Sequence, residues 1–361
     1  MQLKYLNSLA FLSLSGLLVA AGSAPNRDSA GHLPGLLTPV EDNEESSDLE
    51  WDKDPHQHQA SPLTIGDPDV VGQWWHRKLE LNAVWSFGSG KGTMIADCDA
   101  GYYIDEQELQ SNLLTKIRQD LADQDAPRAV NDGSYPSHGT AVASLMVAAL
   151  DGQGTNGIAF NAKLVPLQNY NYDSSLDDLD IIEATTRCIM TAATNPEIDI
   201  LVVQTQLPEG SLESDRELRN AMRLATLAGL LVIIPAGNSA REIDEPQVAT
   251  GALVVGAINR QGDRSIFSNY GPGVDLATYG ENLKTIFGPD GRSGVFGGTA
   301  AAAAIVAATA AIIYEVNPQL TPGEVKRILK LTSDQTSGTA DMGGALNILK
   351  AIRVAKERNP N

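Results

Sequence analysis

Three short segments carry residue types that could act together in acyl transfer, namely an acid, an imidazole and an amide. One strand-like segment ends in Asp99, and a later one ends in Asn238. Between them, Ser137 is a good N-cap residue, which places His138 in the first turn of a helix. The positive end of the helix dipole disfavours imidazolium there, which suits a histidine that acts as a base. An amide at a strand end is a suitable oxyanion donor.

The order and flanks of these segments resemble the subtilisin-like serine peptidases, family S8. Members of that family carry an Asp at the end of an early strand, then His-Gly-Thr, then Ala-Gly-Asn. Connecting stretches such as 267–271 also match, and the resemblance covers residues 67–335. It implies that Asp99 orients the imidazole, His138 is the base and Asn238 is the oxyanion donor. It also implies a three-layer α/β fold, with a mostly parallel, doubly wound sheet and helices on both faces.

The nucleophile of the family is missing from this sequence. Family members have serine where Ala300 stands, at the start of a long apolar helix. A methyl group has no lone pair and cannot attack a carbonyl, and removal of the nucleophile alone from subtilisin lowers kcat by roughly 10⁶. We therefore expect an inactive peptidase homologue that still binds a peptide or a protein.

The resemblance also places the substrate-binding positions. Gln204, Thr205 and Gln206 stand where the family usually has Ser-Leu-Gly, and the two long amides should crowd the binding site. Gly237 and Thr299 complete the predicted substrate-binding set.

Two other functions stay open. One is a serine endopeptidase whose active form carries serine at position 300, with Ala300 as an engineered knockout. The glutamine pair described above and the lack of a folded propeptide favour natural loss over a knockout. The other is an interaction protein of the cell envelope that acts through an acidic tether.

The elements that must position these residues alternate along the chain. Short apolar runs predict parallel strands buried on both faces, and the stretches between them predict helices on both sides of the sheet. Sites in such sheets lie at the carboxyl ends of the strands. The predicted strands are 93–98, 162–167, 199–203, 229–234 and 252–257. The predicted helices are 138–150, 176–194, 213–228, 299–315, 322–332 and 343–357. The apolar run 300–314 is shorter than the ~20 residues that a bilayer span needs, so it predicts a buried core helix.

Length and charge set the remaining expectations. The chain has 361 residues and a formal net charge of -19, which argues against nucleic acid and anionic membrane surfaces as partners. Residues 1–24 read as a signal peptide, 25–66 as an acidic disordered linker and 67–357 as one subtilisin-like domain. We therefore expect an exported monomer, secreted or held in the periplasm or envelope, without a transmembrane segment in the mature chain.

Buried thiols, metals and acids complete the expectations. Cys98 in a strand and Cys188 in a helix seldom meet the Cα spacing of a disulfide, so we expect two buried free thiols. No acidic loop has convincing ligand spacing for the structural calcium that many family members bind, and no cofactor is expected. Asp97 shares a strand face with Asp99, which should raise one of the two carboxyl pKa values. The alternative for Asp97 is a hydrogen bond to nearby backbone or to a helix N-terminus.

Overall fold

A computed structural model describes residues 72–116, 118–122, 136–170, 177–205, 207, 215–243, 250–286, 288 and 291–358. The predicted signal peptide, the predicted acidic linker and Gln206 lie outside the described residues.

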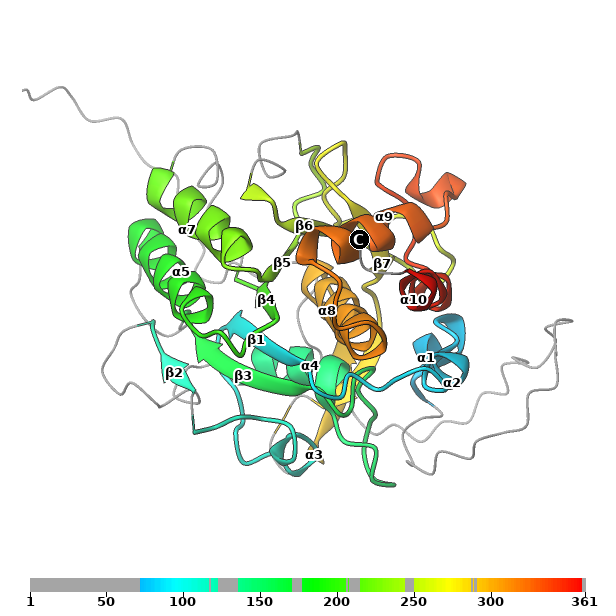
Figure 1. The fold of residues 1–361 in the computed structure, drawn as a ribbon, viewed down its shortest axis with the longest axis horizontal. Helices are drawn as coiled ribbons and strands as arrows, with labels where there is room; N and C mark the ends of the chain where they lie inside the picture. Colours follow the sequence, from blue (N-terminus) through cyan, green and yellow to red (C-terminus); the bar gives the residue numbers. More distant parts are fainter. Residues whose placement is uncertain are drawn as a thin grey trace, which may run out of the picture. The chain divides into compact units, whose positions relative to one another are not determined.

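A parallel sheet of seven strands forms the centre of the described chain (Figure 1). Its strands are β1 (Met94–Asp99), β2 (Gln119–Asp120), β3 (Lys163–Gln168), β4 (Ile200–Val203), β5 (Leu231–Pro235), β6 (Leu253–Ile258) and β7 (Leu276–Tyr279). Their order in the sheet is β2-β3-β1-β4-β5-β6-β7. The strand order therefore reverses at β1, and sites in such sheets lie at the carboxyl ends near this reversal. A two-stranded antiparallel ribbon, β8 (Leu283–Ile286) and β9 (Ser293–Phe296), follows the sheet.

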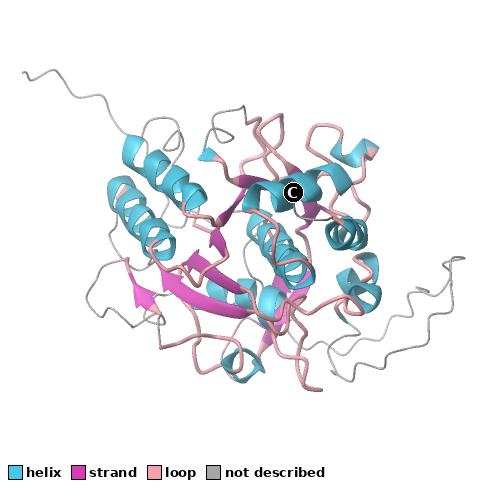
Figure 2. Ribbon diagram, in the orientation of Figure 1, coloured by secondary structure: helices cyan, strands magenta, loops and turns pink. Residues whose placement is uncertain are grey.

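Helices lie on both faces of the sheet, so the fold is a three-layer α/β structure (Figure 2). On one face, α4 (Pro136–Val147) and α8 (Thr299–Val316) pack over the side chains of alternate strand residues such as Ile95 and Val202. On the other face, α5 (Asp178–Ala193) and α7 (Arg216–Leu227) cover the intervening residues. The remaining helices are α1 (Trp74–Lys78), α2 (Leu81–Val84), α3 (Gln107–Gln110), α9 (Pro322–Thr332) and α10 (Ile348–Glu357), with a 3₁₀ turn at Ser337–Thr339.

Helix α8 is buried along nearly its whole length. It is long and apolar enough to cross a membrane by length and composition, but its residues from Thr299 to Ile313 are buried inside the protein. The run of alanines at 300–304 gives this helix a thin profile, so the sheet, α4 and α10 all approach it closely. This confirms the prediction of a core helix.

The predicted elements agree with the structure in type and nearly in bounds. All five predicted strands are present, with ends that differ by at most two residues. Helix α4 begins at Pro136, so Ser137 lies in its first turn and the predicted N-cap role is wrong. The last helix begins at Ile348, where the Asn347 side chain accepts a hydrogen bond from the Lys350 N–H, and not at residue 343.

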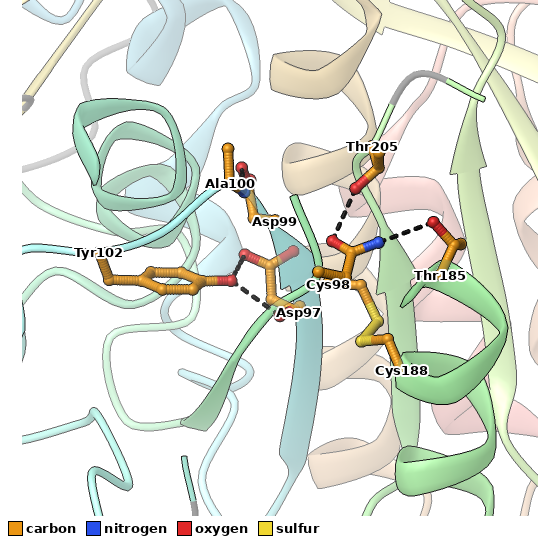
Figure 3. Close-up of a disulfide and its surroundings, with 9 residues drawn as sticks. Asp97, Cys98, Asp99, Ala100, Tyr102, Thr185, Cys188 and Thr205 are labelled. Carbon is orange, nitrogen blue, oxygen red and sulfur yellow. Dashed lines mark hydrogen bonds between the residues drawn. A yellow bond between two sulfur atoms is a disulfide. The ribbon is translucent and has the colours of Figure 1, made fainter. Parts of the chain in front are cut away.

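The two cysteines form a disulfide, so the prediction of free thiols is wrong. Cys98 points from β1 to the face that α5 covers, and Cys188 lies on the buried side of α5 (Figure 3). Their Cα atoms are 6.2 Å apart, within the range that a disulfide requires. The helix packs directly on the strand, and this close approach is what the sequence reasoning did not foresee. The bond links the strand that ends in Asp99 to a helix 90 residues along the chain.

Candidate active site

The predicted site residues gather at the carboxyl edge of the sheet. Asp99 is the last residue of β1, and Asn238 lies three residues after β5. His138 is in the first turn of α4, and Ala300 is the second residue of α8. These two helices cover the same face of the sheet, so their first turns meet the strand ends at one place.

His138 and Asp99 form a close pair. The imidazole Nδ1 lies 2.6 Å from Asp99 Oδ1, and the two side chains are 17% and 1% exposed. Burial lowers the pKa of His138, while the charge of Asp99 and its hydrogen bond raise it, and the net pKa is raised above the ordinary value. The charge and hydrogen bond of Asp99 therefore together outweigh the effect of burial on this pKa.

The rest of the His-Gly-Thr triplet holds α4 against the loop that follows β1. A Cβ atom on Gly139 would collide with the Gly101 carbonyl oxygen, so only glycine allows this approach. The Thr140 hydroxyl accepts a hydrogen bond from the Tyr103 N–H at 2.8 Å. These contacts fix His138 within hydrogen-bonding distance of Asp99.

Asp97 lies behind Asp99 in β1 and is fully buried. The Tyr102 hydroxyl lies 3.0 Å from Asp97 Oδ2 and 2.7 Å from the Asp97 carbonyl oxygen (Figure 3). Burial raises the pKa of the Asp97 carboxyl well above its usual range, the charge of Asp99 raises it further, and the hydrogen bond from Tyr102 only partly opposes this. This confirms that one carboxyl of the pair has a raised pKa. The carboxyl partner of Asp97 is the Tyr102 phenol, and not the nearby backbone or the helix N-terminus of the alternative prediction.

Asn238 is held through its amide oxygen. Its Oδ1 accepts hydrogen bonds from the N–H and the hydroxyl of Thr299, both at 3.0 Å. The Thr299 hydroxyl in turn accepts from the Gly237 N–H at 3.0 Å. Because these donors fix the oxygen, the two N–H groups of the Asn238 amide are directed away from Thr299. Thr299 and Gly237, predicted to bind substrate, thus join the end of β5 to the start of α8.

Asn269 supports the same loop, and the sequence reasoning did not single it out as a site residue. Its amide donates to the Ala236 carbonyl at 2.8 Å and accepts from the N–H groups of Ser239 and Arg241 at 3.0 and 3.1 Å. Its backbone N–H donates to the Gly237 carbonyl at 2.9 Å. The signal for it was present, because it lies in the 267–271 stretch that carries part of the family resemblance.

The predicted substrate-binding residues after β4 have different surroundings. The Thr205 hydroxyl donates to Asn169 at 2.7 Å, and the Asn169 amide donates to Thr185 of α5 at 2.9 Å (Figure 3). Thr205 is therefore part of a polar link between β4 and α5. Gln204 is 4% exposed and lies on the same sheet face as Asp99. Gln206 is outside the described residues.

Ala300 places a methyl group at the centre of this arrangement. It is 7% exposed, and its neighbour Thr299 uses its hydroxyl within the fold. The ring of Phe296, from the end of β9, meets the His138 ring edge-on with centroids 5.2 Å apart. His138 could accept a proton at Nε2 as a base, but position 300 offers no hydroxyl or thiol to donate one.

Metal ligands do not gather in the described part of the chain. No group of three or more His, Cys, Asp or Glu side chains there is placed to hold a metal ion. The described residues therefore do not provide a calcium site built from three or more carboxylates.

Comparisons with known proteins agree with this geometry. A sequence model described as the Subtilase family matches residues 90–347, which is more than half of the chain. The chain is 28% identical over 381 residues to a calcium-dependent protease of Trichormus variabilis, covering 88% of this chain and 55% of the relative. It is 27% identical over 387 residues to an extracellular protease of Xanthomonas campestris, covering 96% and 65%. The chain thus spans about half to two thirds of the length of these relatives.

A solved structure shows the same architecture. Proteases from Pseudoalteromonas arctica superpose with a TM-score of 0.69 and 26% identity, over 80% of this chain and 99% of that one. MycP1 from Mycobacterium smegmatis shares the fold, with a TM-score of 0.63 and 20% identity over 77% of this chain and 84% of that one. Since the family model matches most of the described chain and the fold agrees, this protein belongs to the subtilase family.

Proposed function

We propose that this protein is an exported subtilase homologue without peptidase activity, in which Ala300 occupies the position of the nucleophile. Asp99 orients the imidazole, His138 is the remaining base and Asn238 is the remaining oxyanion donor. The observation that carries the proposal is the intact His138–Asp99 pair, 2.6 Å apart, beside a helix start that presents only a methyl group.

The loss of the nucleophile is enough to stop hydrolysis. No acyl-enzyme can form on alanine, and the adjacent Thr299 hydroxyl is committed to Asn238 and Gly237. Removal of the nucleophile from subtilisin lowers kcat by roughly 10⁶ and leaves only the residual effect of binding and the oxyanion donors.

Three observations support export. The first 24 residues have the basic start, apolar segment and small-residue end of a signal peptide, followed by the acidic segment 25–66. The buried Cys98–Cys188 disulfide is typical of proteins that fold in an oxidising compartment. Two of the relatives are named extracellular proteases. The subtilisin-like domain, 67–357, is proposed to act as a monomer that binds a peptide or protein.

Hydrolysis and active-site labelling test the inactivity. Purified protein at high concentration is incubated with a fluorogenic peptide mixture and, separately, with a serine-reactive phosphonate probe. We expect no turnover above the buffer rate and no labelled residue around position 300. Specific labelling at this edge of the sheet, mapped by mass spectrometry, would contradict the proposal.

A second candidate is a serine endopeptidase whose active form carries serine at position 300. The preserved His138–Asp99 pair and the fixed Asn238 amide favour it, as do the protease names of the relatives. The Ala300→Ser variant separates the two functions. Turnover after this single change identifies a knocked-out enzyme, whereas continued inactivity with normal folding identifies a site that has changed further.

A further inference from the structure

A buried contact joins Asp97 to Tyr102, two residues before Asp99 on β1, and the proposed function does not use it (Figure 3). Both side chains are fully buried. The Tyr102 hydroxyl oxygen lies 2.7 Å from the Asp97 carbonyl oxygen and 3.0 Å from Asp97 Oδ2. No cation contributes to the pKa of Asp97 within the described residues. An ionised carboxylate in such a place would be costly, because burial removes its hydration and no positive charge replaces it.

The protons available to this contact favour a neutral Asp97. A phenol has one proton, so Tyr102 can donate fully to only one of the two Asp97 oxygens. When it donates to the nearer carbonyl oxygen, the contact with Oδ2 requires a proton on the carboxyl, and the phenol oxygen accepts that proton's hydrogen bond. Burial and the charge of Asp99 raise the pKa of Asp97 well above its usual range, and burial also raises the pKa of Tyr102. Both groups therefore keep their protons.

The ring of Tyr102 packs against helix α4. A Cβ atom on Gly139 would lie 2.8 and 3.0 Å from two ring carbons of Tyr102, so no side chain fits between the ring and the helix. Gly139 directly follows His138. At the next residue, the Thr140 hydroxyl accepts a hydrogen bond from the Tyr103 N–H at 2.8 Å. The loop after β1 thus holds α4 at the two residues that follow His138.

Tyr102 therefore connects the two elements that carry the His138–Asp99 pair. Its hydroxyl bonds to β1 two residues before Asp99, and its ring lies against α4 one residue after His138. Because His138 Nδ1 lies only 2.6 Å from Asp99 Oδ1, a small movement of either element lengthens this hydrogen bond.

We propose that Tyr102 is a positioning residue that sets the spacing of the His138–Asp99 pair and holds Asp97 as a neutral acid. The inference rests on the proposed function, because it concerns the same pair, and it adds the groups that hold this pair in place. Its test requires no turnover of a substrate. A residue that only filled space would affect the stability of the fold, whereas Tyr102 also affects the pKa of His138.

The pKa of His138 reports both parts of the proposal. The titratable groups nearest to it in the described chain are Asp99 and Asp97 of β1 and Tyr102 of the next loop. The first turns of α4 and α8 contain no acidic residue, and β9 contributes Phe296. Burial lowers this pKa, and the charge and hydrogen bond of Asp99 raise it by more. A longer hydrogen bond to Asp99 would therefore lower the pKa of His138, whereas an ionised Asp97 would raise it.

NMR of the full-length, ¹⁵N-labelled chain measures this pKa, with the His138 signal assigned by its loss in His138→Gln. Tyr102→Phe keeps the ring against α4 and removes the hydroxyl. We expect the acid dissociation constant of the His138 imidazolium to rise about threefold to tenfold, because its hydrogen bond weakens while the imidazole stays buried. Tyr103→Phe is the matched control, because it removes a hydroxyl from the adjacent, half-buried tyrosine and should leave the constant unchanged.

A second variant tests the neutral state of Asp97. Asp97→Asn keeps a neutral side chain that can still bond to Tyr102, so the dissociation constant of His138 should stay at the wild-type value. The infrared spectrum of the wild-type chain at neutral pH should contain a protonated carboxyl band that Asp97→Asn removes. An ionised Asp97 would give no such band, and its replacement by asparagine would raise the dissociation constant. Either of these results overturns the inference.

An unchanged or smaller dissociation constant in Tyr102→Phe also overturns the inference. If Tyr102→Phe fails to fold, the wild-type chain still tests the positioning role. A ring fixed between β1 and α4 flips slowly and gives separate NMR signals for its two sides, and averaged signals would overturn the inference. Peptide hydrolysis by the wild-type chain would contradict the proposed function and leave this inference standing, so the two can fail separately.

Discussion

The disulfide between Cys98 and Cys188 should contribute a large part of the stability of this protein. The perturbation is the double variant Cys98→Ala/Cys188→Ala, which removes the cross-link between β1 and α5. In the chain-entropy description, the cross-link removes conformational entropy from the unfolded chain. The entropy removed grows with the logarithm of the number of residues in the closed loop. For a sequence separation of 90 residues, this gives about 4.6 kcal/mol at 25 °C. Removal of native disulfides typically costs 2–5 kcal/mol, so we expect a loss of about 2–4 kcal/mol.

Urea unfolding followed by tryptophan fluorescence and circular dichroism measures this loss. Reduced wild-type protein is the control, because it keeps both sulfur atoms in the core but lacks the cross-link. If loop entropy dominates, the reduced protein and the double variant lose similar free energies of unfolding, and both show a steeper urea dependence because their unfolded chains are more extended. A loss below about 1 kcal/mol in both would refute the reasoning. A loss confined to the alanine variant would assign the effect to packing in place of the cross-link.

Three further predictions concern the residues around the histidine. Asp99→Asn should lower the pKa of His138, because it removes the charge that raises this pKa and leaves the burial that lowers it. ¹⁵N NMR of the imidazole measures the pKa, and an unchanged value would contradict the assigned cause. Because the pKa of Asp97 is raised in the folded state, the free energy of unfolding should fall as pH rises above the unfolded value near 3.8. Asp97→Asn should flatten this fall, which urea titrations at several pH values measure. A variant whose pH profile runs parallel to that of wild type would contradict this prediction. Gly139→Ala should destabilise the fold by about 1–3 kcal/mol, because a methyl group collides with the backbone of the loop after β1; a thermal melt equal to that of wild type would show that α4 can shift.

Local pattern predicted most of the fold because the strands are short, apolar and buried on both faces. The five predicted strands form the middle of the sheet, from β3 across to β6. The short strands β2 and β7 and the ribbon of β8 and β9 were not predicted, since two to four residues carry too little periodicity to distinguish a strand from a loop. The start of α4 was missed by two residues because Pro136 fits the first turn of a helix as well as Ser137 fits a cap.

The residues of the candidate site could be proposed from the sequence, but the contacts that hold them in place could not. Asp99, His138 and Asn238 could be assigned because their flanking residues resemble a known family. The Cys98–Cys188 bond depends on how closely α5 packs on β1, which no single-chain spacing reveals. Asn269 and the phenol partner of Asp97 depend in the same way on which loops the tertiary fold brings together.

The alanine run that makes α8 thin also bears on the proposed loss of the nucleophile at position 300. Alanine at position 300 adds no polar atom to the buried start of α8, whereas serine there would add a hydroxyl that needs a hydrogen-bond partner. In a lineage selected only for folding, the exchange of serine for alanine at position 300 is therefore neutral or favourable. The reverse exchange, from alanine to serine, slightly lowers the free energy of unfolding. Under the proposed function, selection for stability alone would therefore preserve alanine at position 300, without any compensating change elsewhere in the helix.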